Sequence, residues 1–180
     1  AVVLECPADV STTKNGVATA QDLNGPVTVA YTDSVSNGCG ATKVVSRLWT
    51  ATDVCGNTTN RVQMITVQDT TPPALTLPAS VTLECPADTT TNNCGVAGAL
   101  DAGGPVALGY SDVARNGTGG TKVIARTWTA TDPCGNRTQG VQTITVRDTA
   151  PPTIASALVE TRSQADYAAS SVASSSWQAN

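Results

Sequence analysis

The stretch "WTATDVCGN" occupies residues 49–57, and "WTATDPCGN" occupies residues 128–136, so one phrase occurs twice with a single change. Aligning the two phrases brings further stretches into register, without a gap, at a constant separation of 79 residues, the interval between Cys6 and Cys85. "LECPAD" returns unchanged, and "QMITVQDTTPP" returns as "QTITVRDTAPP". Self-similarity at a fixed period predicts two copies of one small domain.

We call residues 1–71 copy one and residues 72–150 copy two; residues 151–180 form a tail that is not a third copy. The copies are rich in β patterns. "PVTVAYTD" alternates apolar and polar positions, and "TKVVSRLWTATD" and "RVQMITVQD" are runs of Thr, Val and Ile bounded by turn residues. Short strands separated by frequent turns predict an all-β fold of two tandem β-sandwich domains and an extended C-terminal tail.

Composition excludes several classes of function. The net charge is −4 with ten scattered Lys and Arg residues, which argues against a nucleic-acid partner. No apolar run is long enough for a membrane span. The chain has no His, so a Ser nucleophile would need a Lys base, and Lys14, Lys43 and Lys122 lie in no catalytic motif. We therefore expect no enzyme activity and no catalytic residues.

Six cysteines in a chain of this size indicate an oxidising compartment; reduced core thiols or a metal site are the alternatives. The repeat makes Cys6 equivalent to Cys85 and Cys55 equivalent to Cys134. The simplest pairing is one disulfide inside each copy, namely Cys6–Cys55 and Cys85–Cys134.

Cys39 and Cys94 have no equivalents, because they align with Thr118 and Asn15. We expect them to form a Cys39–Cys94 bond between copies, either within one chain or between neighbouring chains. The alternative is that both thiols are unpaired.

"LECPAD", "RTWTATDPCGN" and "QTITVRDTAPP" resemble the hyalin-repeat-like, immunoglobulin-like (Ig-like) modules found along large bacterial surface and secreted proteins. The resemblance covers roughly residues 1–152. It implies Ig-like sandwiches, an extracellular or cell-surface location, and a spacer, adhesion or matrix role. The final residues depart from the pattern.

Copy two is introduced by "PPALTLPASVTLEC", whereas copy one begins at "AVVLEC", with Ala1 matching Ser80. Copy one thus lacks a counterpart of "ALTLP", while "PPTIASALVE" follows copy two. An unpaired sheet edge accepts an added strand, so we expect head-to-tail assembly with copies of the same chain, in which the tail donates the strand. The assembly residues are Ile154, Leu158, Val159, Tyr167 and Trp177. The alternative is a tail that packs on its own copy two.

Calcium is the candidate cofactor. Asp69 and Asp148 adjoin the Pro-Pro linkers, and Asp53 and Asp132 lie in turns, so these four carboxylates could converge between domains. Turn capping is the competing interpretation.

The sequence therefore predicts a structural subunit of an extracellular or cell-surface fibre, assembled by C-terminal strand donation and stabilised by disulfides. The alternative is a fragment of an adhesin or spacer that binds glycan or protein ligands through its loops and is rigidified by calcium.

Overall fold

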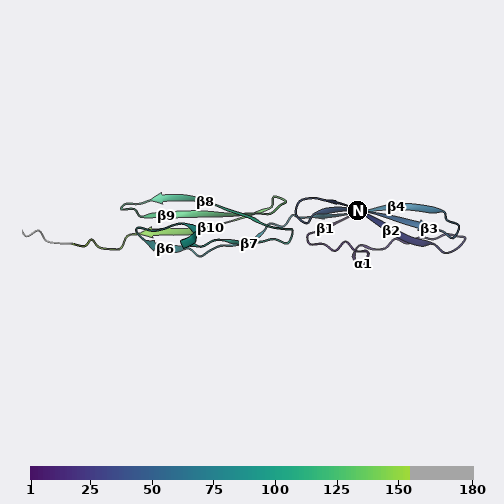
Figure 1. Cartoon of the computed structure of the whole chain (residues 1–180), viewed down its shortest axis with the longest axis horizontal. Helices are drawn as coiled ribbons and strands as arrows, with labels where there is room; N and C mark the ends of the chain where they lie inside the picture. Colours follow the sequence, from purple (N-terminus) through teal and green to yellow (C-terminus); the bar gives the residue numbers. More distant parts are fainter. Residues whose placement is uncertain (155–180) are drawn as a thin grey trace, which may run out of the picture. The chain divides into compact units, whose positions relative to one another are not determined.

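A computed structural model describes residues 1–154 of the chain. The expected all-β class is confirmed (Figure 1). Copy one contains one four-stranded sheet in the order β1-β4-β3-β2. The strands β2, β3 and β4 pair in an antiparallel manner, and β1 lies parallel to β4. The elements are β1 (Val2–Glu5), α1 (Thr12–Asn15), β2 (Thr28–Asn37), β3 (Lys43–Thr52) and β4 (Thr58–Gln68).

Copy two repeats this sheet in the order β6-β10-β9-β8 and adds a two-stranded sheet of β5 and β7. Figure 1 draws β8, β9 and β10 side by side, in teal to green. The elements are β5 (Ala74–Thr76), β6 (Val81–Glu84), α2 (Thr91–Cys94), β7 (Gly98–Leu100), β8 (Ala107–Asn116), β9 (Lys122–Thr131) and β10 (Arg137–Arg147).

The second sheet distinguishes the two copies. In copy two, β5 and β7 pair in an antiparallel manner, with Leu75 opposite Ala99. Residues 19–21 of copy one align with β7 but do not form a strand. No described segment of copy one pairs with them as β5 pairs with β7. The expectation of two complete Ig-like sandwiches therefore stays a prediction, since only copy two has a second sheet here.

Alternation along the central strands explains the core. Along β9, inward positions carry Ile124, Arg126, Trp128 and Ala130, while the positions between them are more exposed. A period of two is what a sheet with one covered face requires. In copy two, Ile124 and Ile144 pack with Cys94 of α2, and Val81 and Leu83 of β6 cover the edge of the cluster.

A buried arginine lies in the centre of each sheet. Arg126 is only 2 % exposed, and its guanidinium donates two 2.8 Å hydrogen bonds to Asp112 and one to the Thr89 carbonyl oxygen. The guanidinium carbon also lies 4.5 Å from the centre of the Tyr110 ring, a cation–π contact. Arg47 makes the same set of contacts in copy one, with Asp33, Val10 and Tyr31.

The repeated phrase forms the turn between the third and fourth strands of each main sheet. In copy one, Asp53 Oδ1 accepts hydrogen bonds from the backbone N–H groups of Cys55 and Asn57, at 2.9 and 2.8 Å. Gly56 adopts a φ of 87°, a conformation that favours glycine. The same bonds recur at Asp132. The phrase thus encodes a turn, as its composition predicts.

Candidate functional site

The two copies are joined by a disulfide between Cys39 and Cys134. Cys39 lies in the loop that connects β2 to β3, and Cys134 lies in the repeated turn of copy two. Cys94 does not pair with Cys39, which corrects the expected pairing. Cys94, the last residue of α2, is buried in the core of copy two, with 3 % of its surface exposed.

The predicted Cys6–Cys55 and Cys85–Cys134 disulfides are also wrong, because Cys6, Cys55, Cys85 and Cys94 are free thiols. The direction of the strands explains the error. Cys6 N–H bonds to the carbonyl oxygen of Gln68 at the end of β4, whereas Cys55 lies just before β4 begins. The 11 residues of β4 span roughly 35 Å. A disulfide requires Cα atoms within about 7 Å of each other.

Hydrogen bonds between the two copies accompany the disulfide. The N–H of Ala41 donates a 2.8 Å hydrogen bond to the carbonyl oxygen of Gly103, and Asn136 Nδ2 donates a 3.0 Å bond to the carbonyl oxygen of Asp69. Gly40 has a φ of 54°, and a Cβ at this position would overlap the Gly103 carbonyl oxygen. Glycine is therefore required where the loop of copy one approaches copy two. We call this region the junction.

Three carboxylates converge at the junction. One carboxylate oxygen from each of Asp69, Asp101 and Asp132 lies within 4.8 Å of the other two. Asp69 follows β4 of copy one, Asp101 follows β7, and Asp132 follows β9. Because the three come from separate segments of both copies, the junction itself brings the charges together.

The three carboxylates differ in their hydrogen bonds. Asp132 Oδ1 accepts from the backbone of Cys134 and Asn136, and its Oδ2 accepts from Asn136 Nδ2 at 2.8 Å. Asp101 Oδ1 accepts from the N–H of Gly103 at 2.7 Å. Asp69 Oδ1 has one long bond, 3.3 Å, from the N–H of Thr71. Its Oδ2 is buried and has no hydrogen-bond donor among the described residues.

These environments move the pKa values in opposite directions. Burial raises the pKa of Asp69, and the neighbouring negative charges of Asp101 and Asp132 add to the effect. Burial also opposes ionisation of Asp132, but the hydrogen bonds from Asn136 hold the pKa of that carboxyl below its ordinary value. Asp69 is therefore the carboxylate of the junction that is least stabilised by protein groups.

The predicted calcium residues are brought together only in part. Asp69 and Asp132 meet at the junction, and Asp101, which the sequence reasoning missed, is the third member. Asp53 lies in the turn of copy one, and Asp148 is not in the cluster. The sequence does mark Asp101, because Asp22 occupies the equivalent position in the repeat. The repeat does not indicate that Asp101 lies at the junction.

The segment 69–79 lies on copy two and provides β5. Asn136 Nδ2 binds the Asp69 carbonyl oxygen, and Thr138 Oγ1 donates a 2.7 Å bond to the Pro73 carbonyl oxygen. Leu77 covers Gly140, where a Cβ would lie 2.8 Å from Leu77 Cδ1. We call residues 69–79 the linker segment, and it is held by side-chain donors of β10 and the turn before it.

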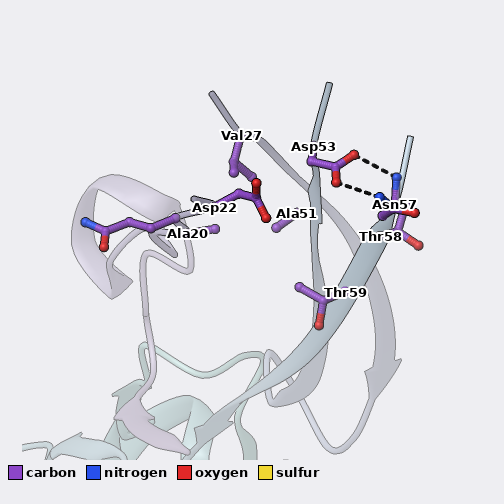
Figure 2. Close-up of a pocket in the computed structure, with 9 residues that line it drawn as sticks. Ala20, Asp22, Val27, Ala51, Asp53, Asn57, Thr58 and Thr59 are labelled. Atoms are coloured by element: carbon purple, nitrogen blue, oxygen red, sulfur yellow. Dashed lines mark hydrogen bonds between the residues drawn. The ribbon is translucent and has the colours of Figure 1, made fainter. Parts of the chain in front are cut away.

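Copy one has a hollow at the position where copy two binds the linker segment. The cavity has a volume of about 180 Å³ and is shown in Figure 2. Asp22 and Asp53 line it from two different segments, and Asn57 and Thr59, the counterparts of Asn136 and Thr138, line it as well. The remaining lining residues are Ala20, Gln21, Val27, Ala51 and Thr58. We call this hollow the copy-one pocket.

Ile154 is the one predicted assembly residue that the structure describes, and its side chain is 90 % exposed. Leu158, Val159, Tyr167 and Trp177 lie outside the described residues. Among residues 1–154, no helix has the length and apolar character needed to cross a bilayer. No protein-family model matches the chain, and no curated protein matches it.

Proposed function

We propose that the chain is a structural subunit of an extracellular or cell-surface fibre, and that the copy-one pocket accepts residues 148–154 of a second copy of the chain. One observation carries the proposal. The copy-one pocket presents the same donor side chains that, in copy two, hold the linker segment.

The register of the repeat identifies the donated residues. Asp148 aligns with Asp69, and residues 151–152 align with the Pro-Pro pair at residues 72–73. Ile154 aligns with Leu75, the middle residue of β5. The exposed Ile154 is thus the residue that would enter the added strand. Full burial of such a side chain contributes roughly 1.5–3 kcal/mol before the costs of association.

The acceptor side has matching groups. Asn57 and Thr59 can donate to the backbone of the incoming segment, as Asn136 and Thr138 do within the chain. The side chains of Leu23 and Val54 are largely exposed beside this surface. Val54 aligns with Pro133, which contacts the glycines of the junction in copy two. The end of copy two of a second molecule would cover both apolar side chains.

One difference between the copies affects which segment fits the copy-one pocket. Gly140 leaves room for Leu77 in copy two, whereas copy one has Arg61 at the equivalent position. The residue that aligns with Leu77 in the tail is Ser156, which is smaller and polar. A serine beside Arg61 requires less space than a leucine, so the tail sequence suits copy one better than the linker segment would.

The disulfide supports the proposed location. Disulfides persist in oxidising compartments, and the Cys39–Cys134 bond fixes one module against the next. We extend the proposal to the domain class: the copies are Ig-like modules of the hyalin-repeat-like kind, in which copy two shows the more complete arrangement because the linker segment supplies β5.

A disulfide-trapping experiment tests the assembly. Position 118 aligns with Cys39, and Cys55 aligns with Cys134. If the contact between molecules repeats the junction, Thr118→Cys places a thiol opposite Cys55 of the next molecule. The variant also carries Cys85→Ser, because the Cys85 thiol lies near the loop that holds position 118 and would compete for the new thiol. A Cβ added at Gly120 in this loop would lie 3.7 Å from Cys85 Sγ. We expect a ladder of covalent oligomers on non-reducing gels that disappears on reduction.

The matched control adds Cys55→Ser to the same variant. The ladder should be lost in this control, and it should be weakened by Ile154→Asp, which places a charge in the donated strand. A ladder that persists without Cys55, or a chain that stays monomeric at all concentrations, contradicts the proposed assembly. A monomer would favour the other candidate, a spacer or adhesin fragment that recognises glycan or protein through its loops.

A further inference from the structure

We propose that Asp69, Asp101 and Asp132 form a calcium site that links copy one to copy two. The inference goes beyond the proposed assembly, because all three residues belong to one chain. Its first support is geometric: oxygens from the three carboxylates lie within 4.8 Å of one another. One cation can therefore contact all three side chains.

The second support is the buried oxygen of Asp69. The residue is only 9 % exposed, and its Oδ2 has no hydrogen-bond donor among the described residues. A buried carboxylate oxygen without a donor is costly, and proteins satisfy such groups with donors, water or metal ions. Asp69 Oδ2 also faces Gly103, where a Cβ would overlap it. Glycine at position 103 is therefore what allows the carboxylate of Asp69 to lie this close to the backbone of copy two.

The charge of the cluster also favours a cation. The ion pairs found in residues 1–154 are Arg47–Asp33, Arg126–Asp112 and Arg147–Glu84, and none of them includes a carboxylate of the junction. Three carboxylates this close repel one another when all are ionised, and a divalent cation removes the repulsion.

The ligand chemistry identifies calcium among common metals. The cluster offers only oxygen, the chain has no His, and Cys134 beside the cluster is in a disulfide. Hard oxygen ligands suit calcium and magnesium, whereas zinc and copper prefer nitrogen and sulfur. Calcium accepts six to eight oxygens in flexible geometry, while magnesium requires a nearly ideal octahedron. Three carboxylates from separate loops, completed by water, fit calcium better.

Copy one provides an internal control. Asp22 and Asp53 align with Asp101 and Asp132 and have equivalent local hydrogen bonds, including a 2.8 Å bond from the N–H of Asn24 to Asp22 Oδ1. Within residues 1–154, three convergent carboxylates occur only at the junction. The hydrogen bonds of the turns are thus common to both copies, and the third carboxylate is what distinguishes the calcium site.

The test is calcium titration of the full chain by calorimetry, at a concentration where sedimentation shows a monomer. We expect one calcium ion per chain, with a dissociation constant in the range of about 10⁻⁴–10⁻³ M that is usual for extracellular modules. Asp101→Asn should weaken binding at least tenfold, and magnesium should bind at least tenfold more weakly than calcium. Asp22→Asn, the matched control, should bind calcium like the unaltered chain.

A second readout does not require the variant to bind calcium. At a hundredfold excess over the dissociation constant, calcium should raise the melting temperature of the unaltered chain by about 5–10 °C. In chelator, Asp69→Asn should melt at or above the unaltered chain, because the substitution removes one of three repelling charges. In the presence of calcium, Asp69→Asn should melt at a lower temperature than the unaltered chain.

Two results would overturn the inference. One is the absence of any calcium-dependent heat or melting shift up to 10 mM, roughly ten times the weakest expected constant. The other is equal loss of binding in Asp22→Asn and Asp101→Asn. Failure of the disulfide ladder leaves the site intact, since the site is intramolecular, so the two proposals can fail separately.

Discussion

Cys39→Ser tests the physical role of the junction most directly. The substitution removes the disulfide between Cys39 and Cys134 while leaving the sheets of both copies unchanged. The Cys39 side chain lies in a loop rather than in either core. The expected loss of stability therefore comes from the disulfide and the junction contacts that it supports.

The magnitude follows from the length of the closed loop. The bonded cysteines are 95 residues apart. In the chain-entropy model a loop of this length stabilises the folded state by about 4.7 kcal/mol at 25 °C. This corresponds to a decrease of roughly 3,000-fold in the ratio of folded to unfolded chains. With a urea m-value of about 2 kcal/mol/M, the midpoint should fall by about 2 M.

Urea unfolding followed by tryptophan fluorescence is the appropriate assay, because Trp49 and Trp128 report on one copy each. Cys55→Ser is the matched control: Cys55 is exposed, occupies the position equivalent to Cys134, and is a free thiol. We expect its midpoint to stay within about 0.3 M of the unaltered chain, as usual for surface substitutions.

Two outcomes would refute this reasoning. If Cys39→Ser and Cys55→Ser shifted the midpoint equally, the disulfide would not be the source of the stability. If addition of reductant left the midpoint of the unaltered chain unchanged, the bond would contribute nothing to the free energy of unfolding. In either case the junction would have to be held by its hydrogen bonds alone.

Three further predictions concern the sheets. Arg126→Ala removes the buried guanidinium and its hydrogen bonds to Asp112 and Thr89, and should lower the free energy of unfolding by about 1.5–3 kcal/mol, measured by urea denaturation. Hydrogen bonds from Arg126 lower the pKa of Asp112 in the folded state, so the unfolded chain binds more protons at acidic pH. The contribution of ionised Asp112 to the free energy of unfolding is complete above about pH 5 and is lost as the pH falls through the folded-state pKa. The free energy of unfolding of Asp112→Asn should therefore fall less on acidification than that of the unaltered chain. Gly140→Val would press on Leu77 and should cost about 1–3 kcal/mol, whereas Arg61→Val at the equivalent position should cost less than 0.5 kcal/mol in thermal melts.

The repeat and its period-two runs predict most of the strands. The run "TKVVSRLWTATD" contains β3, and "RVQMITVQD" contains most of β4, because alternation and β-branched residues are local properties. The helices α1 and α2 were missed. Each has four residues, which is too short for a 3.6-residue period to be visible.

The disulfide and the acidic cluster could not be predicted, because both depend on contacts between the copies. Internal repetition suggested bonds within each copy, but β1 lies parallel to β4 and places Cys6 at the end of the sheet opposite Cys55. Asp22 and Asp101 are the same residue type in the same register. Only the approach of Asp69 to one of them, across the junction, makes Asp101 different.

The Cys39–Cys134 bond has a consequence for proteolysis. Every peptide bond between these residues, including those of the exposed stretch around Thr70 and Thr71, lies inside a covalent ring. A single protease cut in that ring opens the backbone but leaves the two fragments attached to each other. The nicked molecule keeps its full mass until a reductant separates the pieces, so one cleavage in the ring does not sever this tandem.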